Sequence, residues 1–336
     1  MRCIIVNLIG DMARRMAYGG WHRLQGEPVP ITDGVTELTS AAGNEMRVVW
    51  TRGSGCSELA ELLSQEAPNR ISGDIVEGCI NERADLLISR RFPSSFDLVS
   101  VAVPLDFIPE NVARVVSAVA GGPHSFLAAD TASRIGRRLG VEAEMISAIS
   151  PGADPKEAND LLEHIGLSVP EIGGRVVEVD GISDLVAGLD EETLVVLGAP
   201  GGSWLQRSMF GPGARLRSKA PAGAIMVRSA PDRVFRWMGD PVFVSPLRLA
   251  DDTLLFHPEK VLAVADDGML VGLVRRESLE TAGASSVGSI MEEAVSAKVD
   301  ETIAEAMQLE PTFGSDPIPV TDHDEHLVGG LSLPVV

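Results

Sequence analysis

The chain is poor in aromatic residues, in basic residues and in cysteines. Aromatic side chains make up 4% of its 336 residues, which leaves little material for a platform on which nucleic-acid bases could stack. Its 28 Lys and Arg residues are outnumbered by 48 Asp and Glu residues, and the net charge is -20. This negative charge argues against nucleic acid or an anionic membrane as the main partner, while a small anionic ligand can still bind in a locally positive pocket.

Three cysteines, Cys3, Cys56 and Cys79, are too few and too scattered for a disulfide framework or a zinc site, so we expect a reducing cytoplasm. Long hydrophobic runs are also absent. The apolar run at the N-terminus spans about eight residues, is interrupted by Asn7 and is followed by Asp11, which is unlike a signal peptide or a membrane span. We therefore predict a cytoplasmic protein with no membrane insertion.

Between residues 112 and 230 the apolar residues alternate between the spacing of strands and the spacing of helices. Strands are predicted at 114–120, 141–149, 175–180 and 194–198, and helices at 126–140, 155–166 and 182–189. Such alternation implies an α/β fold, a doubly wound parallel sheet with helices on both faces. Ligands of this fold class bind at the carboxyl ends of the strands.

Glycines punctuate the segment after the last of these strands. Gly198, Gly201 and Gly211 have the spacing G-x2-G-x9-G, and glycines let backbone N–H groups approach a phosphate closely. With the element order around it and the closing KAPAGAIMVR, this segment resembles the nucleotide-phosphate loop and domain of the universal stress protein family. The family has Ser or Thr where this chain has Pro212, and commonly an acidic residue where this chain has Ala120.

The resemblance implies an adenine nucleotide, ATP or AMP, as the ligand, with no metal and no further cofactor. The residues it implies lie at the end of the first strand and in the glycine loop: Ala120, Gly121, Gly122, Gly198, Gly201, Gly202, Gly211 and Arg215, with Arg207 as another source of positive charge. The alternative is a glycine-rich crossover that serves packing only.

After an Arg-rich joint at 230–240, the sequence repeats itself. Residues 261–279 and 318–334 each read as strand, acidic turn and strand, and residues 295–307 predict an amphipathic helix through Ile303, Ala306 and Met307. A repeat of about 55 residues implies two copies of one small unit that pack together, because neither copy buries its apolar face alone.

These copies resemble a pair of cystathionine beta-synthase (CBS) domains, which are adenosine-nucleotide sensing modules, over residues 241–336. Nucleotide-binding CBS domains usually carry Thr or Ser, and then Asp, after the last strand. The first copy has Arg275 and Ser278 in this region, and the second has Ser332 and Val335. Arg275 and Ser332 are therefore candidate ligands in the cleft between the copies, while the Arg275–Arg276 pair could equally form a solvated helix face.

Residues 1–111 are less regular. Residues 46–65 read as strand, glycine loop and helix, and two further strands are predicted at 84–91 and 96–108. The segment 52–63 fits either an anion-binding helix N-terminus or an ordinary cap, in which Ser57 caps the helix and Glu58 adds a favourable charge. A partial likeness to the stress-protein pattern makes this region a candidate degenerate copy, which would give a tandem.

The densest group of metal-ligating residue types is Asp322, His323, Asp324, Glu325 and His326. It fits either a metal site or a polar turn, since it aligns with the turn at 266–268 in the first copy. The remaining histidines, His22, His124, His164 and His257, are dispersed and form no Ser-His-Asp or Cys-His grouping in the sequence, although distant residues can meet in space.

We therefore predict an α/β protein with three parts: an N-terminal α/β segment at 1–111, a stress-protein-like domain at 112–230 and a CBS pair at 238–336. The predicted function is non-catalytic and regulatory, sensing an adenine nucleotide as a homodimer, with a protein target as a further partner. The competing interpretation is an interaction scaffold whose nucleotide sites have decayed. A slow ATP hydrolase is a third, for which the sequence nominates no Mg2+ ligands.

Overall fold

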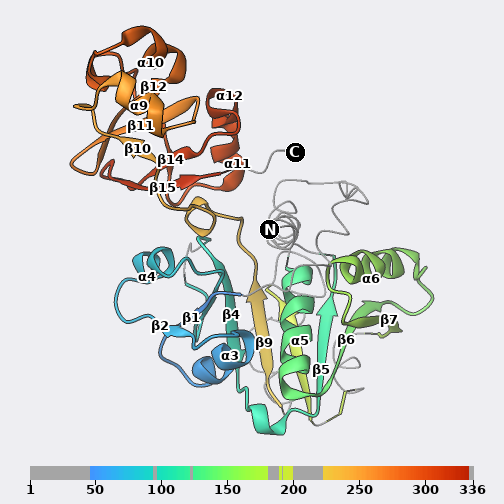
Figure 1. Ribbon diagram of the computed structural model, residues 1–336. Coiled ribbons are helices and arrows are strands. Elements are labelled where there is room, and N and C mark those ends of the chain that lie inside the picture. Colours follow the sequence, from blue (N-terminus) through green and yellow to red (C-terminus); the bar gives the residue numbers. More distant parts are fainter. Residues whose placement is uncertain are drawn as a thin grey trace. The chain divides into compact units, whose positions relative to one another are not determined.

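The computed structural model describes residues 46–93, 97–121, 124–180, 189–190, 192–199 and 222–332. The chain divides into two compact units, residues 1–231 and 232–336 (Figure 1).

Unit 1 is built on a nine-stranded sheet with the order β2-β1-β3-β4-β9-β8-β5-β6-β7. The strands are β1 (Val48–Trp50), β2 (Asn69–Arg70), β3 (Leu86–Ile88), β4 (Ser100–Leu105), β5 (Arg114–Val119), β6 (Glu142–Ile149), β7 (Gly173–Glu178), β8 (Thr193–Gly198) and β9 (Ala224–Arg228). Every neighbouring pair is parallel except β4 and β9, which are antiparallel. The protein is thus a mixed α/β protein with a large, mostly parallel sheet.

In strands β5 to β9 the strand order reverses as in a doubly wound sheet, with β6 and β7 on one side of β5 and β8 and β9 on the other. Helix α5 (Ser125–Leu139) connects β5 to β6, and α6 (Lys156–Ser168) connects β6 to β7. The chain then returns to the other side of β5 to form β8 and β9. Gly140 ends α5 in the left-handed conformation, as expected for a C-terminal glycine. The helix predicted at 182–189 lies largely outside the described residues.

The strands β1 to β4 follow the same order on the other side of the antiparallel pair. Strand β1 leads through residues 51–55 into α3 (Cys56–Leu63), as β5 leads through residues 120–124 into α5. Strand β2 then pairs on one side of β1, and β3 and β4 follow on the other side after α4 (Ile75–Asn81). A short 3-10 helix, η1 (Pro109–Asn111), precedes β5. In both halves of the sheet the chain therefore adds strands first on one side of the opening strand, β1 or β5, and then on its other side.

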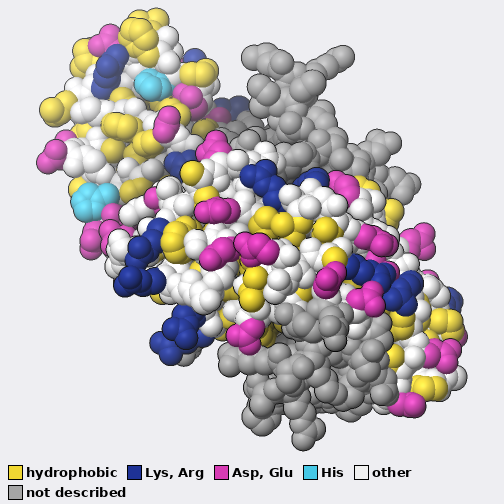
Figure 2. All heavy atoms as spheres, turned by 90° about the horizontal axis from the view of Figure 1, so that it is seen from below, with side chains coloured by type: hydrophobic (Ala, Val, Ile, Leu, Met, Phe, Trp, Pro, Cys, Tyr) yellow, Lys and Arg dark blue, Asp and Glu magenta, His cyan; other side chains and the backbone are white. Residues whose placement is uncertain are grey.

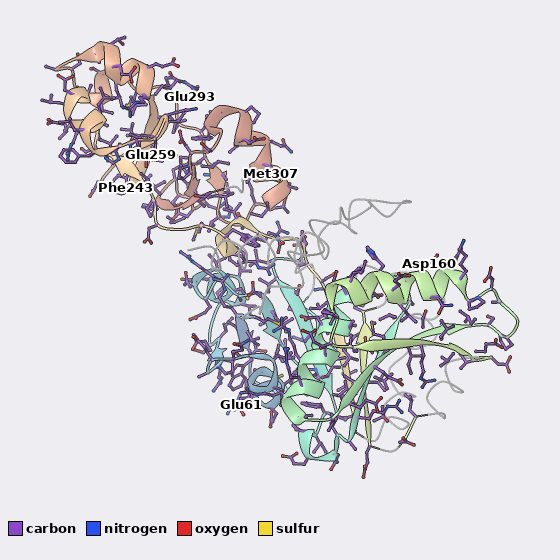
Figure 3. All side chains as sticks on the ribbon, turned by 45° about the vertical axis from the view of Figure 1, so that its right-hand side comes forward. Glu61, Asp160, Phe243, Glu259, Glu293 and Met307 are labelled. Atoms are coloured by element: carbon purple, nitrogen blue, oxygen red, sulfur yellow. The ribbon has the colours of Figure 1, made fainter. Side chains whose placement is uncertain are left out.

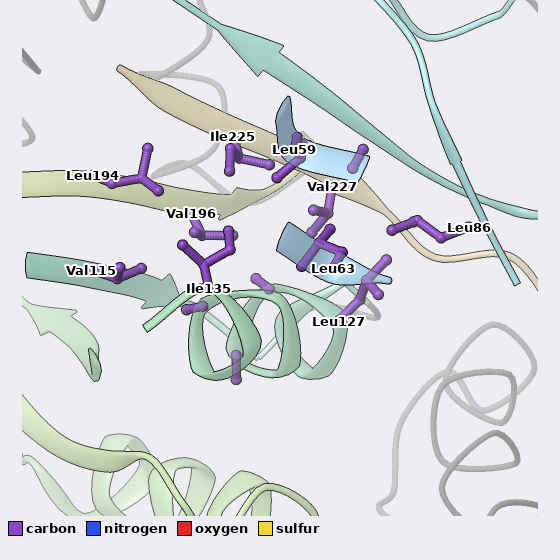
Figure 4. Packing of buried hydrophobic residues seen from close by; sticks show 14 of the residues in the cluster. Leu59, Leu63, Leu86, Val115, Leu127, Ile135, Leu194, Val196, Ile225 and Val227 are labelled. Carbon is purple, nitrogen blue, oxygen red and sulfur yellow. The ribbon is translucent and has the colours of Figure 1, made fainter. Parts of the chain in front are cut away.

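One hydrophobic core serves both halves. Helices α3, α5 and α6 cover the same face of the sheet, and Figure 4 shows Leu59 and Leu63 of α3 beside Leu127 and Ile135 of α5 under strands β8 and β9. Leu59 and Ile135 are fully buried, which stabilises the fold by about 1.5–3 kcal/mol for each side chain. Helix α5 is buried from Ser125 to Gly136, because sheet and α3 enclose it.

Unit 2 contains two three-stranded sheets with the same topology. The first consists of β10 (Phe243–Val244), β11 (Val261–Asp266) and β12 (Met269–Arg275), and the second of β13 (Ala297–Lys298), β14 (Ile318–Thr321) and β15 (Leu327–Leu331). In each sheet a parallel pair is followed by an antiparallel hairpin with a register shift. Helices α9 (Ala250–Phe256) and α10 (Arg276–Ala282) belong to the first copy. The predicted internal repeat is confirmed.

The two copies exchange their first segments. The 3-10 helix η2 (Val234–Arg236) opens the first copy but bonds to the second, and η3 (Val287–Ser289) opens the second copy but bonds to the first. Four backbone hydrogen bonds hold the exchanged segments. In η2, Val234 N donates to Glu301 O and Phe235 N to Val299 O; in η3, Val287 N donates to Arg248 O and Gly288 N to Pro246 O. Most of the segment read as an Arg-rich joint therefore belongs to the fold of unit 2, with Phe235 fully buried.

The predicted helix through Met307 is only partly right. The chain forms α11 (Ile303–Ala306), a 3-10 turn η4 (Met307–Leu309) and α12 (Glu310–Phe313). Ile303 and Ala306 are buried, but Met307 is exposed, and Figure 3 locates it on this helical segment. The tighter 3-10 winding turns Met307 away from the buried face. None of the helices among the described residues is long and apolar enough to cross a membrane.

Candidate functional site

In folds of this class ligands bind where the strand order reverses, which in unit 1 is between the carboxyl ends of β5 and β8. Ala120 and Gly121 follow β5, and Gly198 ends β8. Gly121 has a φ of +74°, which disfavours any residue with a side chain, and the space at its Cβ position is open apart from Leu161 at 3.8 Å. Three of the predicted residues thus meet at this edge. Gly122, Gly201, Gly202, Gly211 and Arg215 lie outside the described residues.

Gly198 has a packing role at this edge of the sheet. A Cβ atom at this position would lie 2.9 Å from the Cβ of His124, closer than real side chains approach. His124 is buried, and its Nδ1 accepts the backbone N–H of Ser229 at 3.0 Å. Glycine at position 198 therefore leaves room for the side chain of His124. At this position the structure fits the alternative interpretation, in which the glycine serves packing.

The structure also brings His124 together with Ser229, a pairing that the sequence did not indicate. The Nδ1 of His124 lies 2.8 Å from the Oγ of Ser229, although the residues are far apart in the sequence. Because the Nδ1 accepts a backbone N–H, it carries no proton, and the neutral ring carries its proton on Nε2. Both residues are buried, so this pair fastens the start of α5 to the end of β9 and offers no accessible nucleophile. No local signal in the sequence marks such a contact.

The corresponding loop of the other half lies before α3. Gly55 is the N-cap with a φ of 73° and no side-chain cap, and the hydroxyl of Ser57 donates instead to Glu58 Oε2 at 2.8 Å. The prediction of an ordinary serine cap is therefore wrong, because Ser57 already lies inside the helix, while Glu58 does stand in the first turn. The side chain of Arg90 lies where a Cβ of Gly53 would be.

In unit 2 the ends of the two hairpins come to a common edge. The carboxylate of Asp316 accepts the backbone N–H groups of Lys260 at 2.7 Å and Val261 at 2.9 Å, which joins the start of β11 to the segment before β14. Arg275 and Ser332 stand at the ends of the strands that pair with β11 and β14. The two candidate residues thus lie on the same edge of unit 2.

Arg275 already has a partner there. Its Nε lies 3.1 Å from Glu292 Oε2, and the two side chains are 40% and 47% exposed. A pair this exposed contributes little, about 0–1 kcal/mol, so an anion could displace Glu292. The neighbouring Arg276 bonds to Glu280 and to the carbonyl of His257, as expected of a residue on a helix surface.

The polar group at 322–326 forms a turn. Asp322 accepts the backbone N–H groups of Asp324 at 2.9 Å and His326 at 2.8 Å, and its Oδ2 lies 3.0 Å from the His326 ring. Burial alone would raise the pKa of Asp322, but these hydrogen bonds outweigh it and lower the pKa. Within the described ranges no group of three or more His, Cys, Asp or Glu side chains could hold a metal ion. The polar-turn interpretation therefore fits.

Acidic and basic side chains of the described residues are interspersed on the face drawn in Figure 2. Because the chain as a whole has a net charge of -20, recognition of an anion depends on short-range contacts with individual basic side chains.

No family model matches the chain, and none of the curated proteins matches it. Among solved structures it is similar to CBS domain pairs over about 30% of its length. A CBS domain pair/ACT domain protein of Thermotoga maritima is 22% identical, with a TM-score of 0.28, over 30% of this chain and 89% of that chain. A CBS-pair protein of Arabidopsis thaliana is 22% identical, with a TM-score of 0.28, over 31% and 89%. A structure of that protein in complex with AMP is 23% identical, with a TM-score of 0.27, over 30% and 90%.

Proposed function

We propose that this protein is a non-catalytic regulatory protein that senses an adenine nucleotide of the ATP or AMP class. The observation that carries the proposal is the paired architecture of unit 2, whose two copies exchange segments and bring Arg275 and Ser332 to a common edge. A guanidinium and a hydroxyl are groups that bind phosphate and ribose. The proposal includes a second site of the stress-protein kind in unit 1, to which the backbone of Ala120 and Gly121 after β5 would contribute. The glycine loop that the resemblance assigns to this site lies outside the described residues.

Sensing follows from binding between two copies. A ligand that contacts both copies of unit 2 favours the arrangement in which both contacts are made, and by linkage that arrangement binds the ligand more tightly. A protein target or a second copy of the chain then binds differently to the new arrangement of the two copies. The proposal assigns no catalytic step, since His124 and Ser229 are buried and the Nδ1 of His124 accepts the backbone N–H of Ser229.

The test is thermal unfolding of the full chain with millimolar ATP, ADP, AMP or S-adenosylmethionine. AMP is tried first, because one of the CBS-pair structures contains it. A ligand that binds only the folded state at about 100 times its dissociation constant adds roughly 2.7 kcal/mol, which is a shift of several degrees. No shift with any of the four compounds would refute the sensor.

Two substitutions locate the site. Arg275→Ala removes the guanidinium and should abolish the shift if the ligand binds unit 2. Glu292→Ala is the matched control, because it breaks the same ion pair but leaves Arg275 free for the ligand, so the shift should persist or grow. Gly201→Asp introduces a carboxylate into the predicted phosphate loop and should abolish a shift that arises in unit 1.

The second candidate function is an interaction scaffold with decayed nucleotide sites. Two observations favour it: His124 fills the space beside Gly198, and Glu292 holds Arg275. Under this interpretation the protein's own side chains have replaced the ligand. Unchanged unfolding temperatures with all four compounds would support it.

A further inference from the structure

The strand order of unit 1 reverses a second time, in the half that comes first in the chain. Strand β1 has β2 on one side and β3 on the other, and the carboxyl ends of β1 and β3 adjoin, since Trp50 pairs with Ile88. Ligands of doubly wound folds bind outside the strand ends at such a reversal. We call the residues that follow these two strands, 52–55 and 89–91, the β1–β3 edge. The nucleotide sites proposed above do not use it.

Positive charge gathers at the β1–β3 edge without acidic partners. Arg52 and Arg90 each lie two residues beyond the last pair of β1 and β3, and Arg91 follows. Among the described residues, none of these three side chains takes part in an ion pair or a hydrogen bond, whereas Arg47 before β1 pairs with Asp85. The chain has 48 acidic and only 28 basic residues. Neighbouring guanidinium groups repel one another, so a cluster left unpaired in such a chain points to an anion as its partner.

The loop after β1 makes room for Arg90 and leaves backbone N–H groups unpaired. A Cβ atom on Gly53 would collide with the aliphatic part of Arg90, so glycine at this position lets that side chain lie against the loop. Cys56 N bonds to Gly53 O at 3.4 Å, but the N–H groups of Ser57 and Glu58 donate to none of the described residues. These are among the first N–H groups of the eight-residue helix α3, where the helix dipole is positive.

The charge of Arg90 acts at the start of this helix. Burial raises the pKa of the Cys56 thiol, Glu58 raises this pKa further, and Arg90 opposes both effects. The carboxylate of Glu58 accepts the hydroxyl of Ser57 at 2.8 Å and forms no ion pair with the arginines of the part described. A guanidinium therefore adjoins unpaired backbone N–H groups, and both kinds of donor bind phosphate oxygens.

We propose that the β1–β3 edge binds a phosphate group, with the guanidinium groups of Arg52 and Arg90 and the N–H groups of Ser57 and Glu58 as donors. Phosphate oxygens point in several directions, so one phosphate can accept from side chains of both strand ends and from the helix at once. The phosphate is either free inorganic phosphate or the phosphate of a small molecule such as a nucleotide. The site is separate from Arg275 and from the edge at Ala120, and it does not depend on either.

The test is titration calorimetry of the full chain with inorganic phosphate, pyrophosphate and AMP at constant ionic strength. Arg52→Gln and Arg90→Gln should each weaken phosphate binding roughly tenfold or more, because each removes a charged donor. Gly53→Ala should also weaken it, since the new Cβ displaces Arg90 without changing the net charge. Glu58→Gln removes a neighbouring negative charge and should tighten binding. Arg138→Gln, at an exposed arginine in the last turn of α5, removes the same charge elsewhere in unit 1 and should change nothing.

Hydrogen exchange locates the site and the competition between ligands identifies the source of the phosphate. Bound phosphate should slow amide exchange at Ser57 and Glu58 in the wild-type chain and not in Arg90→Gln. If AMP displaces phosphate and both are lost in Arg90→Gln, the phosphate is that of a nucleotide; if phosphate binds and AMP does not displace it, the ligand is free phosphate.

Four results would overturn the proposal: a wild-type chain that binds none of the three compounds, an Arg90→Gln chain that binds phosphate as tightly as the wild type, an equal loss in Arg138→Gln, or binding of an oligonucleotide alone. Arg275→Ala separates this site from the nucleotide sensor of unit 2. AMP binding that is lost in Arg275→Ala and kept in Arg90→Gln would support the sensor, and with no phosphate bound at Arg90 it would refute only the site at the β1–β3 edge.

Discussion

Replacing Phe235 by alanine should destabilise unit 2 and leave unit 1 unchanged. Phe235 is fully buried, and its backbone N–H bonds to Val299 of the second copy. Truncating a buried phenylalanine costs about 3–5 kcal/mol, from lost burial and the cavity left behind. For a domain of about 100 residues each kcal/mol lowers the midpoint of unfolding by about 4–8 °C, so we expect a decrease of roughly 12–40 °C.

Differential scanning calorimetry of the full chain measures this effect, because we expect the two compact units to unfold in separate transitions. Phe243→Ala is the control: Phe243 of β10, labelled in Figure 3, is 47% exposed, and its loss should cost less than about 1 kcal/mol. If Phe235→Ala leaves both transitions where they are, the segment before Pro241 is a linker, and the exchange of segments between the copies is refuted.

Three further predictions follow from single contacts. Gly198→Ala should destabilise unit 1 by about 1–3 kcal/mol in urea unfolding, because its Cβ would meet that of His124 at 2.9 Å; unchanged stability would mean that the glycine serves something other than packing. Folding lowers the pKa of Asp322, so its stabilising effect is complete above the ordinary carboxyl range and is lost as the pH falls through the lowered pKa. After correction for the intrinsic exchange rate, amide hydrogen exchange at His326 should therefore accelerate in acid more than exchange in neighbouring turns does. In Asp322→Ala the corrected rate at His326 should not depend on pH. Burial raises the pKa of Cys79 to about 12, so in a Cys3→Ser background a thiol reagent at pH 8 should label this cysteine only after denaturation; rapid labelling of the native protein would contradict its burial.

The spacing of apolar residues was sufficient to predict most of the regular structure. Strands β5, β6 and β8 and helices α5 and α6 lie within a few residues of their predicted bounds. These elements pack one face against the core, and burial of one face requires a period near two or near 3.6. The repeat in unit 2 was visible for the same reason, since its two hairpins keep the same apolar positions.

The predictions failed at one local turn and stopped where a contact joins residues far apart in the sequence. Ser57 is a residue type that often caps helices, but the left-handed turn at Gly55 starts the helix before Ser57. His124 and Ser229 carry no mark of their pairing. Short-range patterns contain no information on which distant side chain fills a crevice, because that depends on how the whole sheet twists and packs.

The amino-acid sequence was enough to establish an α/β protein with a glycine-interrupted crossover and a C-terminal repeat, because periodicity, turn residues and repetition are local properties. Only the folded chain decided that β4 and β9 join two similarly wound halves into one sheet, and that the copies of unit 2 exchange their first segments. It also decided that His124 occupies the space beside Gly198. Each of these depends on pairing across long stretches of chain, where the gain from burying a shared surface outweighs any local preference.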